Sequence, residues 1–429
     1  MYNTAIETLP LEALRTLQSK RLTTLIHRVY RDVPFYKKQL DSAGIHPSDI
    51  RNIEDLHLLP FTRKTDLRDH YPYGLFAKPK EEIRRIHASS GTTGKPTVVG
   101  YTENDLAVFD EVVARSLACA GARKGMTMHN AYGYGLFTGG LGIHGGATKL
   151  GMAVIPVSGG MTTRQLTILE DFKPDVICCT PSYAQTLSEA LVKKGVNPKD
   201  LAIKYAILGA EPWTEAIRKQ VEIGLDVCAT NIYGLSEIIG PGVSQEDFEE
   251  KGSGSYIWED HFFPEIVDKD TGKPLPYGEE GVLVLTTLTK EALPLLRYWT
   301  NDICSIQYDP HAKRTHIKMS PIKGRADDML IIRGVNLFHT QVEEVIHQFD
   351  FLSPNYRLLV TRKGSMDTVD LEVEVAKNVD VAHTNLRELL QKQLKDTIGI
   401  SMVVHLKTPF SIPRSEGGKL NRILDKRSL

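Results

Sequence analysis

The stretch "KPDVICCTPSYAQTLSEALVKKGVNPKDLAIKYAILGAEPW", Lys173 to Trp213, decides the fold class. It holds two short apolar runs, Asp175 to Cys179 and Lys204 to Ala210, and a helical pattern begins after each run, at Ser182 and at Trp213. Short apolar runs that alternate with helices of about ten to fifteen residues are typical of βαβ units, whose strands pair in parallel. The stretch therefore predicts an α/β protein.

The same alternation continues on both sides of this stretch. Helical patterns at residues 11–33 and 103–120 and a strand at 152–157 precede it, and a further strand at 226–234 follows it. From about Gly252 the pattern becomes strand-rich, which indicates a small antiparallel subdomain packed on the first sheet. We expect a large N-terminal domain over residues 1–325, with parallel-rich sheets flanked by helices.

The remaining residues, 326–429, read as a small mobile α+β C-terminal domain with a hinge near Asp327. Helices are expected at 341–349 and 381–397, and strands at 356–361, 369–376 and 402–407. About a hundred residues are enough for a separate domain.

The composition of the chain argues against nucleic acid and membranes as binding partners. The chain has 429 residues, 41% of them hydrophobic, and Lys+Arg 52 balances Asp+Glu 53, so no overall field would draw in nucleic acid or anionic lipid. The five cysteines show no CxxC spacing, and no apolar run has the length of a signal peptide core or a membrane span. We expect a cytoplasmic protein without nucleic-acid or membrane partners.

A second stretch, "HASSGTTGKPTVVGYT" from His87 to Thr102, suits a phosphate chain. Its glycines let the backbone approach a ligand, while hydroxyls and one lysine surround it. The glycines are three residues apart and Pro96 stands where a P-loop carries its magnesium-binding hydroxyl, so a Walker site is a poor match. The expected phosphate-binding residues are Ser89, Ser90, Gly91, Thr92, Thr93, Gly94 and Lys95.

"SSGTTGKP" resembles the phosphate-binding signature of the adenylate-forming superfamily. Together with "VPFYKKQLDSAG", "LPFTRKTDLRDHYPYGLFA" and "YGLSEIIGPGV", it makes the chain similar to the phenylacetate-CoA ligases. The resemblance implies that a carboxylate and ATP give an acyl-adenylate and pyrophosphate, and that the thiol of coenzyme A then displaces AMP. It also implies Mg²⁺ and a homodimer. Phenylacetate is the acid that it suggests first, while benzoate, indoleacetate, larger acids and acceptors other than coenzyme A stay open.

The resemblance implies that Glu237 holds magnesium and is a catalytic residue. It follows an apolar strand and a glycine turn, so its carboxylate should stand at the carboxyl end of a parallel strand, where such sheets bind ligands. The resemblance implies that Tyr233 stacks on adenine, that Ser236 contacts the α-phosphate and that Asp302 binds the ribose. The nucleotide-binding residues expected in this region are Gly209, Ala210, Glu211, Asn231, Ile232, Tyr233, Gly234, Ser236 and Asp302.

The C-terminal third carries the residues that the resemblance assigns to movement and acyl transfer. Arg325 would reach the ribose or phosphate, Asp327 would be the catalytic pivot, and Gly334 and Val335 would line the coenzyme A tunnel. Lys419, in "SEGGKLNR", would bridge the carboxylate and the α-phosphate. One departure from the family pattern stands before Asp302, where the usual "RYRT(G/R)D" reads "RYWTND".

The acid is expected beside the glycine-rich segment 130–142. Glycines there should open space and aromatic rings should form walls for a flat aryl acid. The substrate residues expected are Tyr132, Tyr134, Phe137, Gly139 and Gly140. The acidic and histidine residues of "WEDHFFPE" are instead expected to be structural, because consecutive acids on a strand point to opposite faces.

Two other classes of function remain open from the residues alone. One is a phosphotransferase or ATPase that releases ADP, and the other is a sensor that binds nucleotide or coenzyme A without catalysis. The release of AMP and pyrophosphate would separate a ligase from both.

Overall fold

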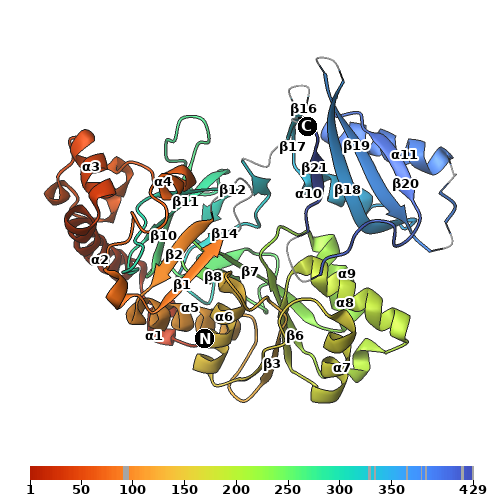
Figure 1. Ribbon diagram of the computed structural model, residues 1–429, viewed down its shortest axis with the longest axis horizontal. Helices are drawn as coiled ribbons and strands as arrows, with labels where there is room; N and C mark the ends of the chain where they lie inside the picture. Colours follow the sequence, from red (N-terminus) through yellow and green to blue (C-terminus); the bar gives the residue numbers. More distant parts are fainter. Residues whose placement is uncertain are drawn as a thin grey trace.

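The computed structural model describes residues 1–89, 96–326, 330–332, 335–363, 366–377, 379–381, 384–416 and 420–427. A large N-terminal part, red to green in Figure 1, carries a smaller C-terminal part, blue, above helices α8 (Pro181–Lys194) and α9 (Glu215–Leu225). None of the described helices is both long and apolar enough to cross a membrane.

Among the described residues, nine strands form the largest sheet, in the order β13-β14-β9-β8-β7-β6-β5-β3-β4. Five neighbouring strands run parallel: β4 (Ala153–Ile155), β3 (Thr127–Asn130), β5 (Val176–Cys179), β6 (Tyr205–Gly209) and β7 (Cys228–Leu235). The antiparallel remainder is β8 (Gly240–Glu246), β9 (Ser255–Ile257), β14 (Lys318–Met319) and β13 (Ile306–Gln307). The α/β prediction is confirmed, with a mixed sheet.

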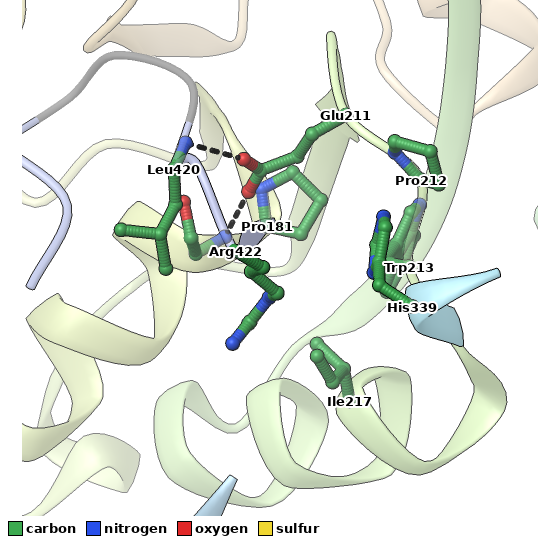
Figure 2. Close-up of a pocket in the computed structure, with 9 residues that line it drawn as sticks. Pro181, Glu211, Pro212, Trp213, Ile217, His339, Leu420 and Arg422 are labelled. Carbon is green, nitrogen blue, oxygen red and sulfur yellow. Dashed lines mark hydrogen bonds between the residues drawn. The ribbon is translucent and has the colours of Figure 1, made fainter. Parts of the chain in front are cut away.

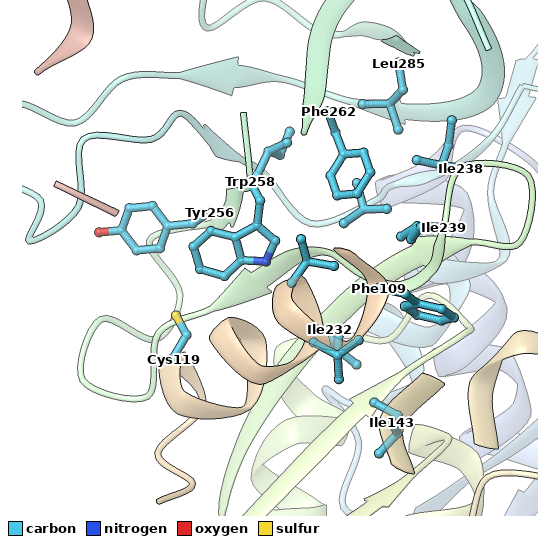
Figure 3. Close-up of a cluster of buried hydrophobic side chains, with 14 of the residues drawn as sticks. Phe109, Cys119, Ile143, Ile232, Ile238, Ile239, Tyr256, Trp258, Phe262 and Leu285 are labelled. Atoms are coloured by element: carbon cyan, nitrogen blue, oxygen red, sulfur yellow. The ribbon is translucent and has the colours of Figure 1, made fainter. Parts of the chain in front are cut away.

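Alternate strand residues pack against helices on opposite faces of this sheet. On β5, Cys178 joins a core cluster with α5 (Glu103–Cys119) and α6 (Thr138–Leu150), whereas Ile177 joins a cluster with α7 (Thr162–Phe172), α8 and α9. Figure 3 shows the first cluster, in which Phe109 of α5 and Ile143 of α6 lie beside Ile232 of β7. The period of two along a strand thus explains the continuous apolar runs, because both faces are covered.

The predicted antiparallel subdomain is a second sheet with the order β10-β11-β12-β15. Its strands are β10 (Phe262–Val267), β11 (Gly281–Thr287), β12 (Tyr298–Cys304) and β15 (Gly324–Arg325). The N-terminal helices lie beside it, since side chains of α2 share a core cluster with Leu288 and Leu296. These elements are α1 (Thr4–Glu7), α2 (Leu11–Asp32), α3 (Pro34–Ser42), η1 (Pro47–Asp49), η2 (Ile53–Leu58), α4 (Lys64–Asp69) and η3 (Lys80–Glu82).

Helix α6 is absent from the sequence-based expectation, which took residues 130–142 as an open, glycine-rich segment. Its glycines allow close packing on α5 instead. A Cβ on Gly142 would lie 2.2 Å from the ring of Phe109, and a Cβ on Gly146 would lie 2.2 Å from Cγ1 of Val113. The expectation that glycines of residues 130–142 open space is therefore wrong at Gly142, because the ring of Phe109 on the partner helix fills the space.

The segment "WEDHFFPE" contains a turn between β9 and β10, so the strand expected at Glu259 and Asp260 is wrong. Asp260 and His261 nevertheless have the expected structural role, because they take part in a buried ion-pair cluster. Arg115 donates two hydrogen bonds to the buried carboxylate of Asp260, at 2.8 and 3.0 Å, and His261 Nε2 lies 3.1 Å from it.

The C-terminal part has its own core and a four-stranded sheet, β20-β19-β18-β21. Its strands are β18 (Leu352–Lys363), β19 (Met366–Val375), β20 (Val403–Lys407) and β21 (Ile423–Asp425), and its helices are α10 (His339–Ile346) and α11 (Thr384–Ile398). A hairpin of β16 (Leu330–Ile332) and β17 (Val335–Leu337) precedes them. The expected α+β pattern is present, while the division at residue 325 stays a prediction.

We expect Gly146→Ala to destabilise the fold by about 1–3 kcal/mol, because the added methyl group overlaps Val113 in a packed core. Chemical denaturation measures the free energy of unfolding. Gly139→Ala on the same helix is the control, since its Cβ would sit 3.7 Å from Tyr132, an ordinary contact. Equal stabilities of the two variants would contradict the tight α5–α6 contact.

Asp260→Asn should cost about 1.5–3 kcal/mol at neutral pH, because it removes the charge of the carboxylate that accepts two hydrogen bonds from the buried Arg115 guanidinium and leaves Glu111 to balance that guanidinium. Burial alone would raise the pKa of the Asp260 carboxyl, but His261 and Arg115 hold it well below its usual range. A depressed carboxyl pKa contributes stability above its unfolded value, and that stability is lost as the pH falls through the folded value.

The difference in unfolding free energy between the wild type and Asp260→Asn should therefore shrink as the solution is made acidic, below about pH 4. Asp270→Asn, at a side chain that is 74% exposed, is the matched control and should have little effect. A difference that stays constant with pH would contradict the assigned ion pair.

Candidate functional site

The candidate site lies where β6 and β7 end, and close backbone contacts explain its glycines. A Cβ on Gly209 would stand 2.1 Å from the carbonyl oxygen of Ile232, and one on Gly234 would stand 1.9 Å from that of Gly240. Ala210 directly follows β6 with a φ of +75°. The chain therefore turns sharply at the carboxyl ends of neighbouring parallel strands, the edge where such sheets bind ligands.

Three residues that the sequence assigned to the nucleotide meet at this edge. The hydroxyl of Tyr233 donates a hydrogen bond of 2.6 Å to Oδ2 of Asp302, and a guanidinium nitrogen of Arg325 lies 3.8 Å from Oδ1. The pairing of β12 with β15 sets Asp302 opposite Arg325. Burial raises the pKa of Tyr233 well above its ordinary value, so the hydroxyl keeps its proton and acts as a donor.

Glu237 lies in the turn between β7 and β8, with a side chain that is largely buried. Its Oε1 is 3.7 Å from Nζ of Lys64, the first residue of α4, and its carboxylate also interacts with the hydroxyl of Tyr298. In the described parts of the chain, no three His, Cys, Asp or Glu side chains gather as a metal site. One carboxylate that shares Mg²⁺ with substrate phosphates needs no such group, so Glu237 fits this role.

A buried lysine supports the turn that carries Glu237. Lys290 Nζ donates to the carbonyl oxygens of Glu237, at 3.2 Å, and Ile238, at 2.8 Å, while the hydroxyl of Tyr101 donates to that of Ile239 at 2.8 Å. Burial lowers the pKa of Lys290 to about 8. The carbonyl oxygens of three consecutive residues thus accept hydrogen bonds from buried side chains, which holds the turn in place.

Sequence reasoning missed both Lys64 and Lys290 as parts of the site. The basic "RKTD" around Lys64 was a weak signal, and nothing in the letters around Lys290 shows that it is buried.

The expected phosphate loop joins β1 (Arg85–Ser89) to β2 (Thr97–Tyr101), which pair as an antiparallel hairpin. Ser89 faces Thr97 across the hairpin, and the buried hydroxyl oxygens of both have no hydrogen-bond partner among the described residues. Such a pair suits a ligand that supplies the missing bonds.

Several predicted residues lie outside the described parts of the chain. They are Ser90, Gly91, Thr92, Thr93, Gly94, Lys95, Asp327, Gly334 and Lys419. Val335 is described by its backbone in β17.

Three other predicted nucleotide residues have structural contacts. Ile232 packs in the core beside Phe109, and the backbone N–H of Asn231 donates to Glu246 at 3.0 Å. The hydroxyls of Ser236 and Thr138 are 3.0 Å apart, which ties the turn to the start of α6.

The expected walls of the acid pocket differ in exposure. Tyr132 is buried in the core and Phe137 is 53% exposed. Tyr134 is half-buried, and its hydroxyl accepts from Nδ2 of Asn130 at 2.7 Å and lies 3.0 Å from Nδ1 of His144. Burial raises the pKa of Tyr134 to about 12.

The two predicted glycines beside these rings differ in the space around them. Gly139 has room around it, whereas a Cβ on Gly140 would lie 2.5 Å from the carbonyl oxygen of Gly133, so Gly140 opens no space. Asn130 and His144 were not predicted.

Trp299 and Asn301, which depart from the family pattern before Asp302, make local contacts with each other and with aromatic and basic neighbours. Trp299 packs edge-on against Phe61 at 5.0 Å, the guanidinium of Arg63 lies 4.3 Å above its ring, and its Nε1 donates to Asn301 at 2.8 Å. Asp302 keeps its bond to Tyr233.

Comparison with known proteins gives matches over the full length. The chain matches the family model of the AMP-binding enzymes over residues 13–288 and that of the AMP-binding enzyme C-terminal domain over residues 334–427. It is 60% identical to the phenylacetate-coenzyme A ligase of Thermus thermophilus, with 100% of both chains covered. The chain belongs to the phenylacetate-CoA ligase family. The predicted family and the adenylate-forming ligase fold are thereby confirmed.

Solved structures of a related ligase indicate which arrangement of the two parts is present. The chain superposes on 2-hydroxyisobutyryl-CoA ligase in the postadenylation state with a TM-score of 0.92, at 26% identity, covering 99% of this chain and 92% of that one. The thioesterification state of that ligase, with its adenylate and CoA, gives 0.74 at 27% identity and the same coverage. The fold of this family member therefore carries its C-terminal part as in a postadenylation state.

Tyr233→Phe should raise the KM for ATP by about tenfold, because Asp302 loses a charge-assisted hydrogen bond that orients it. Initial rates over a range of ATP concentrations measure this. Tyr205→Phe, at the opposite end of the neighbouring strand β6, is the control and should leave the KM unchanged. An unchanged KM in Tyr233→Phe would show that this hydroxyl does not position the nucleotide site.

Proposed function

We propose that this chain joins phenylacetate to coenzyme A in two steps. The carboxylate of phenylacetate attacks the α-phosphate of ATP, giving phenylacetyl-adenylate and pyrophosphate, and the thiol of coenzyme A then displaces AMP. The observation that carries the proposal is the meeting of Tyr233, Asp302 and Arg325 beside Glu237, in a chain 60% identical to a phenylacetate-coenzyme A ligase along its whole length.

The chemistry requires a site that gathers positive charge and orients the nucleotide. A carboxylate is a poor electrophile, and conversion into a mixed anhydride with AMP removes its charge and supplies a good leaving group. We assign Asp302 to the two ribose hydroxyls, since one carboxylate can accept from both. Mg²⁺, held by Glu237 and the phosphates, would neutralise charge on the triphosphate.

The phosphates themselves are assigned to Ser89 and residues 90–95, with Ser236 near the α-phosphate. The unpartnered hydroxyls of Ser89 and Thr97 support this placement, because a phosphate oxygen of the ligand would accept their hydrogen bonds. Lys95 would add a positive charge.

The acid is assigned to the region of Tyr134, which presents a half-buried ring held by Asn130 and His144. An aromatic ring held in place by hydrogen bonds can stack on the ring of an aryl acid. Phenylacetate itself comes from the relatives, and benzoate, indoleacetate or a larger acid are the alternatives.

The C-terminal assignments complete the proposal. Arg325 would contact the ribose or a phosphate, Asp327 would be the hinge, Gly334 and Val335 would line the path of coenzyme A, and Lys419 would neutralise the reacting carboxylate. A homodimer and a cytoplasmic location are proposed from the same resemblance.

Phosphorus NMR of the products tests the proposal. With phenylacetate, ATP, Mg²⁺ and coenzyme A, we expect AMP and pyrophosphate in equal amounts, together with a thioester. The formation of ADP, or of no nucleotide product, would contradict it. A panel of benzoate, indoleacetate and phenylacetate then ranks the acids by kcat/KM.

Lys419→Ala should abolish phenylacetate-dependent exchange of pyrophosphate into ATP while still converting supplied phenylacetyl-adenylate and coenzyme A into thioester. The reason is that a lone ammonium stabilises the charge that develops in the first step only. Lys392→Ala, at an exposed position on α11, is the control. Normal exchange in Lys419→Ala would show that the assigned role is wrong.

A further inference from the structure

The carboxylate of Glu211 joins the two parts of the chain. Its Oε1 accepts a hydrogen bond of 2.6 Å from the backbone N–H of Ser182, and its Oε2 accepts one of 3.1 Å from that of Leu420 (Figure 2). Ser182 lies in the first turn of α8, where helix N–H groups lack partners and favour a negative charge. One oxygen is thus anchored to the N-terminal part while the other holds the C-terminal tail.

The surroundings shield this pair of bonds. Figure 2 shows Pro181, Pro212, Trp213 and Leu420 around a small pocket that also meets Arg422. Trp213 and Arg422 are both more than nine-tenths buried. Hydrogen bonds to a charged group are stronger where water is excluded, so the carboxylate is well placed to hold the tail.

Other hydrogen bonds between the N-terminal and C-terminal parts are made by side chains that do not contact Leu420. Thr214 donates to Glu343 of α10 at 3.0 Å, and Glu189 of α8 accepts from Asn355 at 3.1 Å and from Arg414 at 3.0 Å. These contacts belong to the arrangement that matches the postadenylation state.

From this geometry we propose that Glu211 is a positioning residue for the adenylation half-reaction: it fastens the backbone at Leu420 and so fixes the tail beside Lys419. The inference rests on the proposed function, in which Lys419 meets the reacting carboxylate.

The physical reason is the entropy of the tail. Holding a lysine side chain at a reacting centre costs conformational entropy, and a fixed backbone N–H at Leu420, the residue that follows Lys419, removes part of that cost before the reaction. The benefit applies to the step that uses the lysine, so loss of Glu211 should act on one half-reaction.

The test measures both half-reactions in Glu211→Ala and Glu211→Gln. We expect Glu211→Ala to slow phenylacetate-dependent pyrophosphate exchange by about tenfold or more, and to change the conversion of supplied phenylacetyl-adenylate and coenzyme A by less than about twofold. Glu211→Gln keeps one carbonyl oxygen, which serves one of the two N–H groups, so it should show the same split in weaker form.

Glu215→Gln is the matched control, because Glu215 stands in the first turn of α9, is 60% exposed and pairs with Arg218. It should leave both half-reactions unchanged. The thermal midpoint of each variant is measured as well, and a purely structural role would lower both half-reactions in step with the loss of stability.

Two results would overturn the inference. One is unchanged exchange in Glu211→Ala, and the other is an equal loss in both half-reactions, which would place Glu211 on the nucleotide or in the fold. A wild-type enzyme that forms no AMP from phenylacetate would instead refute the proposed function, so the two failures are distinguishable.

Discussion

The hydrogen bond from the Tyr233 hydroxyl to Asp302 joins the two sheets of the N-terminal part. Tyr233 stands on β7 of the nine-stranded sheet and Asp302 on β12 of the antiparallel sheet. The turn with Ser236 and Glu237 begins immediately beyond β7. Strand β15, which pairs with β12, carries Arg325 at the end of the predicted N-terminal domain. The proposed contacts of Asp302, Arg325 and Ser236 with the nucleotide therefore depend on the distance at which this bond holds the two sheets.

Much of this arrangement could be predicted from the sequence, because its signals are local. The apolar runs that became β5, β6 and β7 were visible from composition and length, and the rule that parallel strands bind ligands at their carboxyl ends placed Glu237 correctly beside the other strand ends. The family motif supplied Tyr233 and Asp302. Their direct contact was not predicted, since the two residues are 69 positions apart.

The failures have a common physical cause. Helix α6 was missed because glycines disfavour an isolated helix, and only the packing of α5 against them reveals their purpose. Lys290 was missed because its burial comes from Tyr101 and the Glu237 turn, which are distant in sequence. Glu211 was assigned to nucleotide binding from its motif, yet its carboxylate accepts a hydrogen bond from the backbone N–H of Leu420, 209 positions away. Tertiary partners decided each case.

The central claim is that Asp302, held by Tyr233, binds the ribose of the adenylate beside Glu237. A crystal structure with a non-hydrolysable phenylacetyl-adenylate analogue measures this most directly. The claim predicts both ribose hydroxyls within about 2.5–3.0 Å of the Asp302 carboxylate, with the phenyl ring near Tyr134. A nucleotide bound elsewhere, or a ribose without contact to Asp302, would contradict it.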